Sequence, residues 1–338
     1  MNYFSLLKEC SQGGQHNVLI DFSPEDGVLL TIKGKKRSYL RWLMLKAELF
    51  EVVANGENSG VEFKRDVEVL PVAGTSLSTL DKSRLSYYLQ DIIKDPEIPQ
   101  TDGEWIERLL GLGLMADDGM GNRVCSIAGL LCFGIKPRRF LPQAGLRVMA
   151  FQGDDKEYQA LLDVVLDAPL VGRWQRSASG RKELIDEGLI EKFSFQIEPF
   201  ITQEASVIDK NMRREKSWYY PWEAIRETVI NALAHRDWTR SVDIEVTNYS
   251  DRLEVISPGK LQNSMTVSKM VAGQRSPRNT LIMEILRDYG YVDARGMGVR
   301  TKVIPLMRNI NQAEPVFEAT EDYLKTILYR KRADGSLL

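Results

Sequence analysis

Residues 224–238 read Ala-Ile-Arg-Glu-Thr-Val-Ile-Asn-Ala-Leu-Ala-His-Arg-Asp-Trp, and this stretch decides the fold of the chain. It follows Pro221, which suits the first turn of a helix because its missing N–H would have no intrahelical partner there. Apolar residues recur in it at four-residue steps, namely Ile225, Val229 and Leu233. This spacing predicts a helix that begins at Pro221 and packs one side on a core.

A second row of residues recurs at the same step, two positions out of phase: Glu227, Asn231 and His235. Helical geometry places this polar row on roughly the opposite side of the helix. A carboxylate, an amide and an imidazole in one row could serve a metal–phosphate site, as a base for water, a neutral magnesium ligand and a polar neighbour. The same spacing is also typical of a solvated helix face, so both interpretations stay open.

The composition is that of an ordinary globular protein. The chain has 338 residues, of which 43% are hydrophobic and 27% charged, enough for two or three cores. Its apolar runs are short, and its N-terminus lacks the order of a signal peptide, so we expect a cytoplasmic protein without membrane association. Three widely spaced cysteines and only two histidines argue against a zinc site. A net charge of −2 gives no overall attraction to nucleic acid, although local basic clusters exist.

Alternating and periodic segments predict a mixed architecture in the first 210 residues. Strands are expected at Val18–Phe22, Val28–Lys33, Arg123–Ser126 and Leu146–Phe151. Helices are expected at Leu43–Ala54, Asp81–Ile93 and Glu104–Leu112, and over most of Arg181–Ile201. Two helices followed by a turn and a strand resemble a small winged-helix layout.

The pattern is sharper after residue 211. Strands are expected at Val242–Asn248, Arg252–Ile256 and Tyr323–Tyr329, and a helix at Leu281–Leu286. Residues 260–278 are polar and predict a long loop. Gly296-Met297-Gly298 is expected to open a further helix, which Pro305 could kink.

The order of elements after residue 220 resembles that of the GHKL ATPase superfamily. It runs from a Glu-x-x-x-Asn helix to a strand ending in a glycine turn, then a long loop and Gly-x-Gly. Residues 71–330 more closely resemble the RecG-like, ATP-binding transcriptional regulators. The matching stretches are Ser126–Gly134, Arg226–Asp237, Asp251–Gly259, Arg278-Asn279 and Gly296–Gly298. The resemblance implies an α/β (α+β) fold, with a GHKL (Bergerat-type) sandwich at 211–332 and a helical, winged-helix-like and α/β region at 71–210.

The resemblance also implies an ATP–Mg²⁺ site. Asn231 would hold Mg²⁺, and Glu227 would orient or deprotonate the attacking water. Gly296 and Gly298 would let the backbone close on the phosphates, and residues 260–278 would form a lid. The remaining nucleotide-binding candidates are His235, Arg236, Ser257, Gly259, Arg278 and Asn279.

Two departures limit what the resemblance implies. Ser257 stands where GHKL ATPases usually place an aspartate that reads the adenine amino group, and a charge-assisted hydrogen bond is roughly twice as strong as a neutral one. The phosphate-binding loop of a helicase motor requires Gly-x-x-x-x-Gly-Lys-[Ser/Thr]. Gly34-Lys35 and Gly259-Lys260 have Leu29 and Glu254 where its first glycine belongs, so a helicase motor is excluded.

Residues 46–70 resemble the first part of a Schlafen/Alba-like DNA-binding domain. Compared with the usual size of such a domain, about a hundred residues are missing here. Glu57 and Glu62 have the spacing of metal ligands in nuclease members of that group. The third carboxylate and the sheet do not follow, which disfavours a metal-dependent nuclease. Residues 1–45 form an unassigned N-terminal α+β segment.

Two functions are therefore expected from the sequence. The first is an ATP-binding, DNA-associated transcriptional regulator with slow ATP hydrolysis, acting as a homodimer. The alternative is a catalytically inactive GHKL-like adaptor that binds DNA or a protein partner.

Overall fold

The computed structural model describes residues 67–176, 181–208, 214–262, 265–292 and 298–330, together with three strands nearer the start. The chain divides into two compact units, residues 1–65 and 66–338. The first contains an antiparallel sheet of β1 (Asn17–Phe22), β2 (Gly27–Lys33) and β3 (Tyr39–Leu45). β1 and β2 confirm the predicted strands. The helix predicted from Leu43 is wrong for residues 43–45, which complete β3 against β2, and residues 46–54 lie outside the described part.

The second unit begins with helices and a hairpin in the predicted order. α3 (Lys82–Tyr87) continues through Tyr88–Ile92, and α4 (Asp102–Gly111) precedes β4 (Met115–Asp117) and β5 (Arg123–Cys125). Asp81 and Thr101 cap the two helices by accepting hydrogen bonds from free backbone N–H groups. α5 (Ile127–Phe133) is buried along its whole length, and this anchors the region to the main core.

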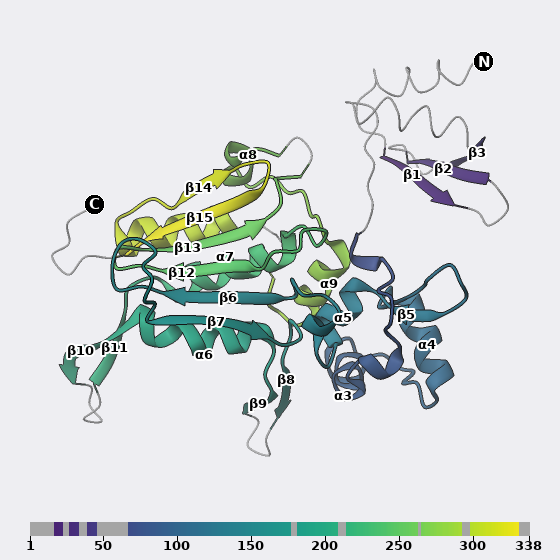
Figure 1. Ribbon diagram of the computed structural model, residues 1–338, viewed down its shortest axis with the longest axis horizontal. Helices are drawn as coiled ribbons and strands as arrows, with labels where there is room; N and C mark the ends of the chain where they lie inside the picture. The colour runs from purple at the N-terminus through teal and green to yellow at the C-terminus, as the bar shows by residue number, and fades with distance from the viewer. Residues whose placement is uncertain are drawn as a thin grey trace. The chain divides into compact units, whose positions relative to one another are not determined.

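A six-stranded sheet forms the centre of this unit, in the order β14-β15-β13-β12-β6-β7 (Figure 1). The strands are β6 (Gly145–Ala150), β7 (Leu162–Asp167), β12 (Ile244–Asn248), β13 (Arg252–Pro258), β14 (Val316–Ala319) and β15 (Tyr323–Tyr329). β6 and β12 are parallel, and the other pairs are antiparallel. The predicted limit at residue 210 therefore falls inside one compact unit, because the sheet takes strands from both sides of it.

Helices cover one face of the sheet. α6 (Leu189–Ile201) packs on β6 and β7, and α7 (Trp222–His235) packs on β12 and β13. The opposite face carries charged side chains in ion pairs such as Arg147–Asp163, Lys156–Glu245 and Lys325–Glu318. The fold is thus a mixed α/β arrangement, as predicted, with its core between the sheet and the helices.

Two hairpins extend from the body beside α6 (Figure 1). One pairs β8 (Arg173–Arg176) with β9 (Lys182–Asp186), and the other pairs β10 (Thr202–Ile208) with β11 (Arg214–Trp218). The helix predicted over 181–201 is therefore wrong before Leu189. Strong helix formers in Lys182–Asp186 are overridden by pairing with β8.

The remaining helices contact different parts of this unit: α8 (Val267–Val271) packs near β14, and α9 (Thr280–Asp288) packs on α5 and α7. α8 interrupts the predicted loop, and α9 confirms a predicted helix. A further helical segment runs through Val299–Val303, Ile304–Leu306 and Met307–Asn311, so Pro305 does not end it.

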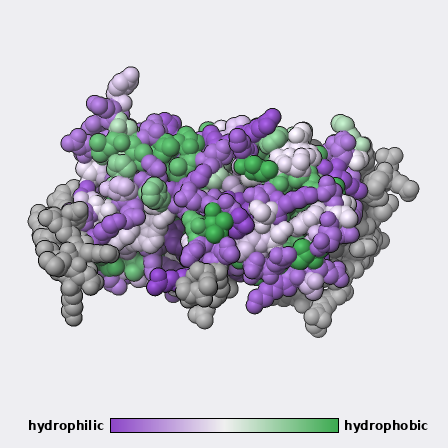
Figure 2. Space-filling model, turned by 90° about the horizontal axis from the view of Figure 1, so that it is seen from below, coloured by the Kyte–Doolittle hydropathy of each residue, from purple (hydrophilic) through white to green (hydrophobic). Residues whose placement is uncertain are grey.

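The surface is mostly polar in the view of Figure 2, where hydrophobic residues form separate patches. Among the described residues, no helix has both the length and the apolar character needed to cross a bilayer.

Candidate functional site

α7 places its two predicted rows in different surroundings. Ile225, Val229 and Leu233 are buried in the core. Glu227, Asn231 and His235 instead line a cavity of about 320 Å³. The other walls are β13, β15, the 260–278 segment, α9 and the start of the 299–311 helix. The structure therefore brings the polar row into one cavity.

Glu227 and Asn231 form a polar pair in this cavity. The Asn231 Nδ2 group donates to Glu227 Oε1 at 3.3 Å, one helical turn away. Glu227 is buried, with 6% exposure, and its Oε2 lies 3.9 Å from the Lys302 ammonium. Among the described residues, none donates a hydrogen bond to Asn231 Oδ1. The pair thus offers an amide oxygen and a carboxylate, both of which are ligand types that suit Mg²⁺.

Gly298 fits against Glu227 because it has no side chain. A Cβ at this position would lie 1.6 Å from Glu227 Oε1, so the carboxylate would have to move. Gly298 itself has helical dihedral angles and continues into the helical segment from Val299.

His235 lies at the other end of the row. It is half-buried, and its ring makes no hydrogen bond to another described residue. Burial and the nearby Arg278 guanidinium lower the pKa of His235 to about 4. The imidazole is therefore neutral at physiological pH and can act as a hydrogen-bond acceptor.

The floor of the cavity combines apolar and hydroxyl side chains from neighbouring strands. Val255 and Ser257 come from β13, and Leu324 and Thr326 lie opposite them on β15. The Ser257 hydroxyl donates to the Ala232 carbonyl of α7 at 3.2 Å. Thr326 is a cavity residue that the sequence analysis missed, although strand alternation could have placed it on the same face as Leu324.

Positive charge exceeds negative charge among the described residues that line the cavity. The cations are Lys260, Arg275, Arg278, Arg287 and Arg300, whereas the carboxylates are Glu227 and Glu284. The Arg300 guanidinium donates to the Ala272 carbonyl at 2.9 Å, which holds the end of α8 over the cavity. An excess of cations in a confined space favours an anionic ligand. Periodicity could not find these cations, because most of them lie in irregular segments.

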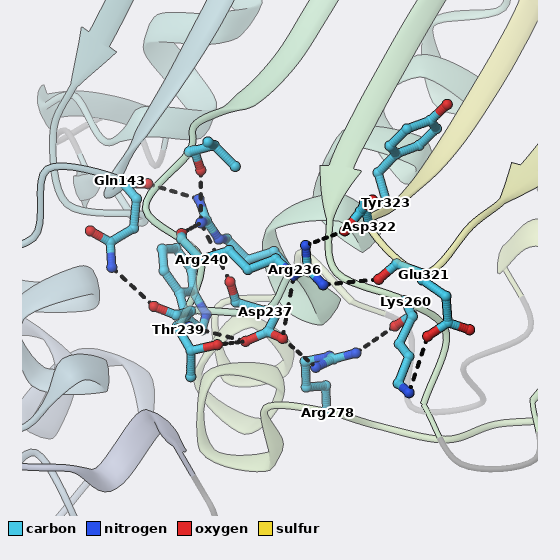
Figure 3. A network of polar contacts seen from close by, with 12 residues as sticks. Gln143, Arg236, Asp237, Thr239, Arg240, Lys260, Arg278, Glu321, Asp322 and Tyr323 are labelled. Carbon is cyan, nitrogen blue, oxygen red and sulfur yellow. Dashed lines mark hydrogen bonds and ion pairs between the residues drawn. The ribbon is translucent and has the colours of Figure 1, made fainter.

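A second group of polar residues, here named the polar knot, lies near the C-terminal end of α7 (Figure 3). Unlike Asn231, its central members donate hydrogen bonds to backbone carbonyls. Figure 3 labels five of its members, namely Gln143, Arg236, Asp237, Arg240 and Arg278, and the sixth is Asn279. Arg236 is fully buried and donates to the carbonyls of Gln143, Arg240 and Val242 at 2.7–2.9 Å. Asn279 donates to the carbonyls of Ala234 and Arg236. Neither Arg236 nor Asn279 lines the cavity.

Both ends of the 260–278 segment meet at Asp237. Gly259, the residue before the segment, has a φ of +107°, and a Cβ there would lie 2.5 Å from Asp237 Cβ. At the other end, the Arg278 guanidinium lies 3.2 Å from the Asp237 carboxylate and donates to the Lys260 carbonyl (Figure 3). Arg278 and Gly259 therefore fasten the base of this segment and also line the cavity.

Three of the predicted site residues lie outside the described part of the chain: Gly296, Glu57 and Glu62. The other predicted nucleotide-site residues divide into two groups. Glu227, Asn231, His235, Ser257, Gly259, Arg278 and Gly298 line one cavity, whereas Arg236 and Asn279 belong only to the knot.

Comparisons with known proteins agree with this C-terminal architecture. Residues 241–328 match a family model described as "Putative ATP-dependent DNA helicase recG C-terminal". These residues belong to an ATPase-like domain. The matched range contains Ser257, Arg278 and Gly298 but begins after α7, so the structure alone places Glu227 and Asn231 beside them.

No curated protein matches the chain. Among solved structures, the DIP2311 protein from Corynebacterium diphtheriae is similar in fold, with a TM-score of 0.53 and 21% identity. The alignment covers 94% of this chain and 60% of that protein, so the chain spans less than two thirds of its structural relative.

Proposed function

We propose that the cavity binds ATP together with Mg²⁺. The observation that carries this proposal is the convergence of Glu227, Asn231 and an excess of cations in one cavity of an ATPase-like domain. ATP–Mg²⁺ presents a metal for oxygen ligands and phosphates for cations, and it carries a flat base for an apolar floor.

Asn231 would hold the metal through Oδ1, the amide oxygen that has no described protein donor. Bound Mg²⁺ would neutralise charge on the phosphate oxygens. Gly298 supports the placement of Glu227 in this site, because the backbone without a Cβ leaves room for the carboxylate. Glu227 would orient the attacking water and accept its proton, which gives slow hydrolysis.

The wider proposal is that nucleotide binding regulates association with DNA, as the resemblance to transcriptional regulators implies. α4 does not support a DNA contact of its own, because its exposed side chains include Asp102, Glu104 and Glu107. Binding of the chain to duplex DNA with and without ATP–Mg²⁺, at two salt concentrations, tests this part separately. A homodimer in the cytoplasm completes the proposal, and light scattering tests the dimer.

The alternative is an inactive adaptor, and one observation favours it. The strand position that usually carries an aspartate has Ser257, whose hydroxyl proton is used by the Ala232 carbonyl. An uncharged floor weakens nucleotide binding relative to a carboxylate. The adaptor would bind its partner without any effect of nucleotide.

Calorimetric titration of ATP and ADP, with and without Mg²⁺, tests the binding proposal. We expect Mg²⁺-dependent ATP binding to the wild type and a loss of at least about tenfold in affinity for Asn231→Ala. Asn309→Ala removes an exposed asparagine outside the cavity and should bind like the wild type. Absence of binding at millimolar ATP would favour the adaptor.

Phosphate release tests the role of Glu227. We expect Glu227→Ala to lose turnover while it keeps Mg²⁺-dependent binding. Unchanged turnover in this variant would contradict the assignment of Glu227 as the residue that activates water.

A further inference from the structure

The beginning of the second unit is bonded to the beginning of α9. Glu68 follows Arg65, the last residue of the first unit, by three positions, and it is 1% exposed. Its two carboxylate oxygens accept hydrogen bonds from the backbone N–H groups of Leu281 and Ile282, at 2.7 and 3.0 Å. A buried carboxylate therefore connects the start of this unit to a helix more than two hundred residues further along the chain.

The local sequence leaves the first N–H groups of α9 available for a distant partner. Asn279 holds the N-cap position, but its side chain accepts no hydrogen bond from the first turn of α9. Its amide nitrogen instead donates to the carbonyls of Ala234 and Arg236 at the end of α7. A helix N-terminus needs acceptors for its first N–H groups and is stabilised by negative charge. Glu68 supplies both, so it takes the place of a local cap.

A different face of α9 forms part of the cavity wall. Its cavity residues are Thr280, Met283, Glu284 and Arg287. Thr280 directly precedes Leu281, whose N–H group bonds to Glu68. The first turn of α9 therefore contacts Glu68 and also faces the cavity, although Glu68 itself does not line the cavity.

We propose that Glu68 is a positioning residue for the cavity and couples ligand binding to the start of the second unit. The two-state element is the first turn of α9, which is either formed and capped by Glu68 or locally opened. A ligand that contacts Thr280 and Arg287 binds the formed state more tightly, because only this state holds both side chains on the cavity wall. Ligand binding thus strengthens the contact with Glu68, and the contact strengthens ligand binding by the same factor. This inference rests on the proposed binding of ATP–Mg²⁺.

Hydrogen exchange of the wild type, with and without saturating ATP–Mg²⁺, tests the coupling. The reporter is the segment 67–70, which does not line the cavity and in which the Leu70 N–H group donates to the Val67 carbonyl at 3.2 Å. We expect ATP–Mg²⁺ to slow exchange about fivefold in this segment and at Leu281 and Ile282, as for a modest coupling between two sites. Exchange in α4, which does not line the cavity, should stay unchanged.

A variant assigns the coupling to Glu68. Glu68→Gln keeps the size of the side chain but presents an NH₂ group to one of the two backbone N–H groups, so one hydrogen bond is lost. We expect the affinity for ATP–Mg²⁺ to fall about fivefold. ATP–Mg²⁺ should still slow exchange in α9 but should no longer slow it in residues 67–70. Each variant is compared with its own ligand-free state, so a uniform loss of stability does not produce this pattern.

Glu104→Gln is the matched control. The Glu104 carboxylate accepts hydrogen bonds from the N–H groups of Gln100 and Thr101 at the start of α4, at 2.7 and 3.4 Å. This variant also alters a carboxylate at a helix N-terminus, but on a helix outside the cavity. It should bind ATP–Mg²⁺ like the wild type and keep the protection of residues 67–70. Thermal melting confirms that both variants are folded.

Two results would overturn the inference while ATP–Mg²⁺ still binds. One is a wild type in which ATP–Mg²⁺ slows exchange in α9 but not in residues 67–70, and this result decides the matter even if Glu68→Gln does not fold. The other is a folded Glu68→Gln variant that keeps both the wild-type affinity and the protection. If the wild type does not bind ATP–Mg²⁺, the proposed function fails and this inference fails with it.

Discussion

Two polar regions meet near the end of α7, and they contain the same kinds of side chain. Asn231 faces the cavity, and its amide oxygen accepts no hydrogen bond from a described residue. The amide nitrogen of Asn279 instead donates to two backbone carbonyls in the polar knot. His235 faces the cavity, whereas Arg236, the next residue, is completely buried. The difference teaches that residue type does not define a role here. A side chain whose polar atoms all bond to the backbone stabilises the fold. A side chain with an unpaired polar atom that faces the cavity can bind a ligand.

The largest expected effect lies in the knot. Arg236→Ala would leave the carbonyls of Gln143, Arg240 and Val242 without their donor and would remove a cation–π contact with Trp238. We expect the free energy of unfolding to fall by about 3–5 kcal/mol, because several buried carbonyls lose one charged donor at the same time. Urea denaturation measures this change.

Arg147→Ala is the matched control for that experiment. Arg147 bonds Asp163 on the solvated face of the sheet, where both side chains are about two-fifths exposed. An exposed pair of this kind contributes at most about 1 kcal/mol. Similar losses for the two arginine variants would contradict the distinction between the knot and the surface.

A second effect concerns pH and the cavity row. The pKa of His235 falls from 6.5 to about 4 on folding, so the unfolded chain binds a proton at pH 5 that the folded chain does not. Its contribution to stability is therefore complete above pH 6.5 and is lost as the pH falls through 4. Between pH 7 and pH 5 the free energy of unfolding should decrease by about 2 kcal/mol from this group.

Urea denaturation of His235→Gln at the two pH values isolates the contribution of His235. The variant should lose less stability than the wild type, while His16→Gln, which removes the other histidine, serves as the control. An identical pH dependence in the wild type and His235→Gln would show that His235 is not held neutral.

The smallest effect is expected on ligand affinity at Gly298. The Cβ of Gly298→Ala would push the Glu227 carboxylate further into the cavity, where its charge would repel the proposed phosphates. We expect ATP–Mg²⁺ binding to weaken about tenfold, close to 1.4 kcal/mol. Gly103→Ala is the control, because a Cβ at Gly103 meets no atom within 4 Å. Undiminished binding in Gly298→Ala would separate Glu227 from the nucleotide site.

Periodicity in the sequence predicted the elements that form the cavity, because each has one buried face. The apolar row Ile225, Val229 and Leu233 placed α7, and alternation placed β12, β13 and β15. Prediction failed where pairing with a distant strand decided the outcome. Lys182–Asp186 begins with three good helix formers, Lys182, Glu183 and Leu184, yet it forms β9 by pairing with β8.

The part of the site that lies on α7 could be predicted from the sequence. Glu227, Asn231 and His235 share a face by their four-residue spacing, and all three line the cavity. Arg236 could not be placed by spacing, because it is the C-cap, with ψ of 155°, where the chain leaves the helix. Arg300 and Thr326 were missed because their approach to α7 depends on tertiary packing.

Urea denaturation with and without a fixed millimolar concentration of ATP–Mg²⁺, on the wild type, Asn231→Ala and Asn279→Ala, tests the distinction between cavity and knot most directly. A ligand that binds only the folded state raises the free energy of unfolding, so one experiment reads both stability and binding. We predict that Asn279→Ala lowers the stability without ligand by about 2 kcal/mol and keeps the increase from ATP–Mg²⁺. Asn231→Ala should keep the stability without ligand and lose that increase. Loss of the increase in both variants, or its retention in both, would contradict the separation of the cavity from the knot.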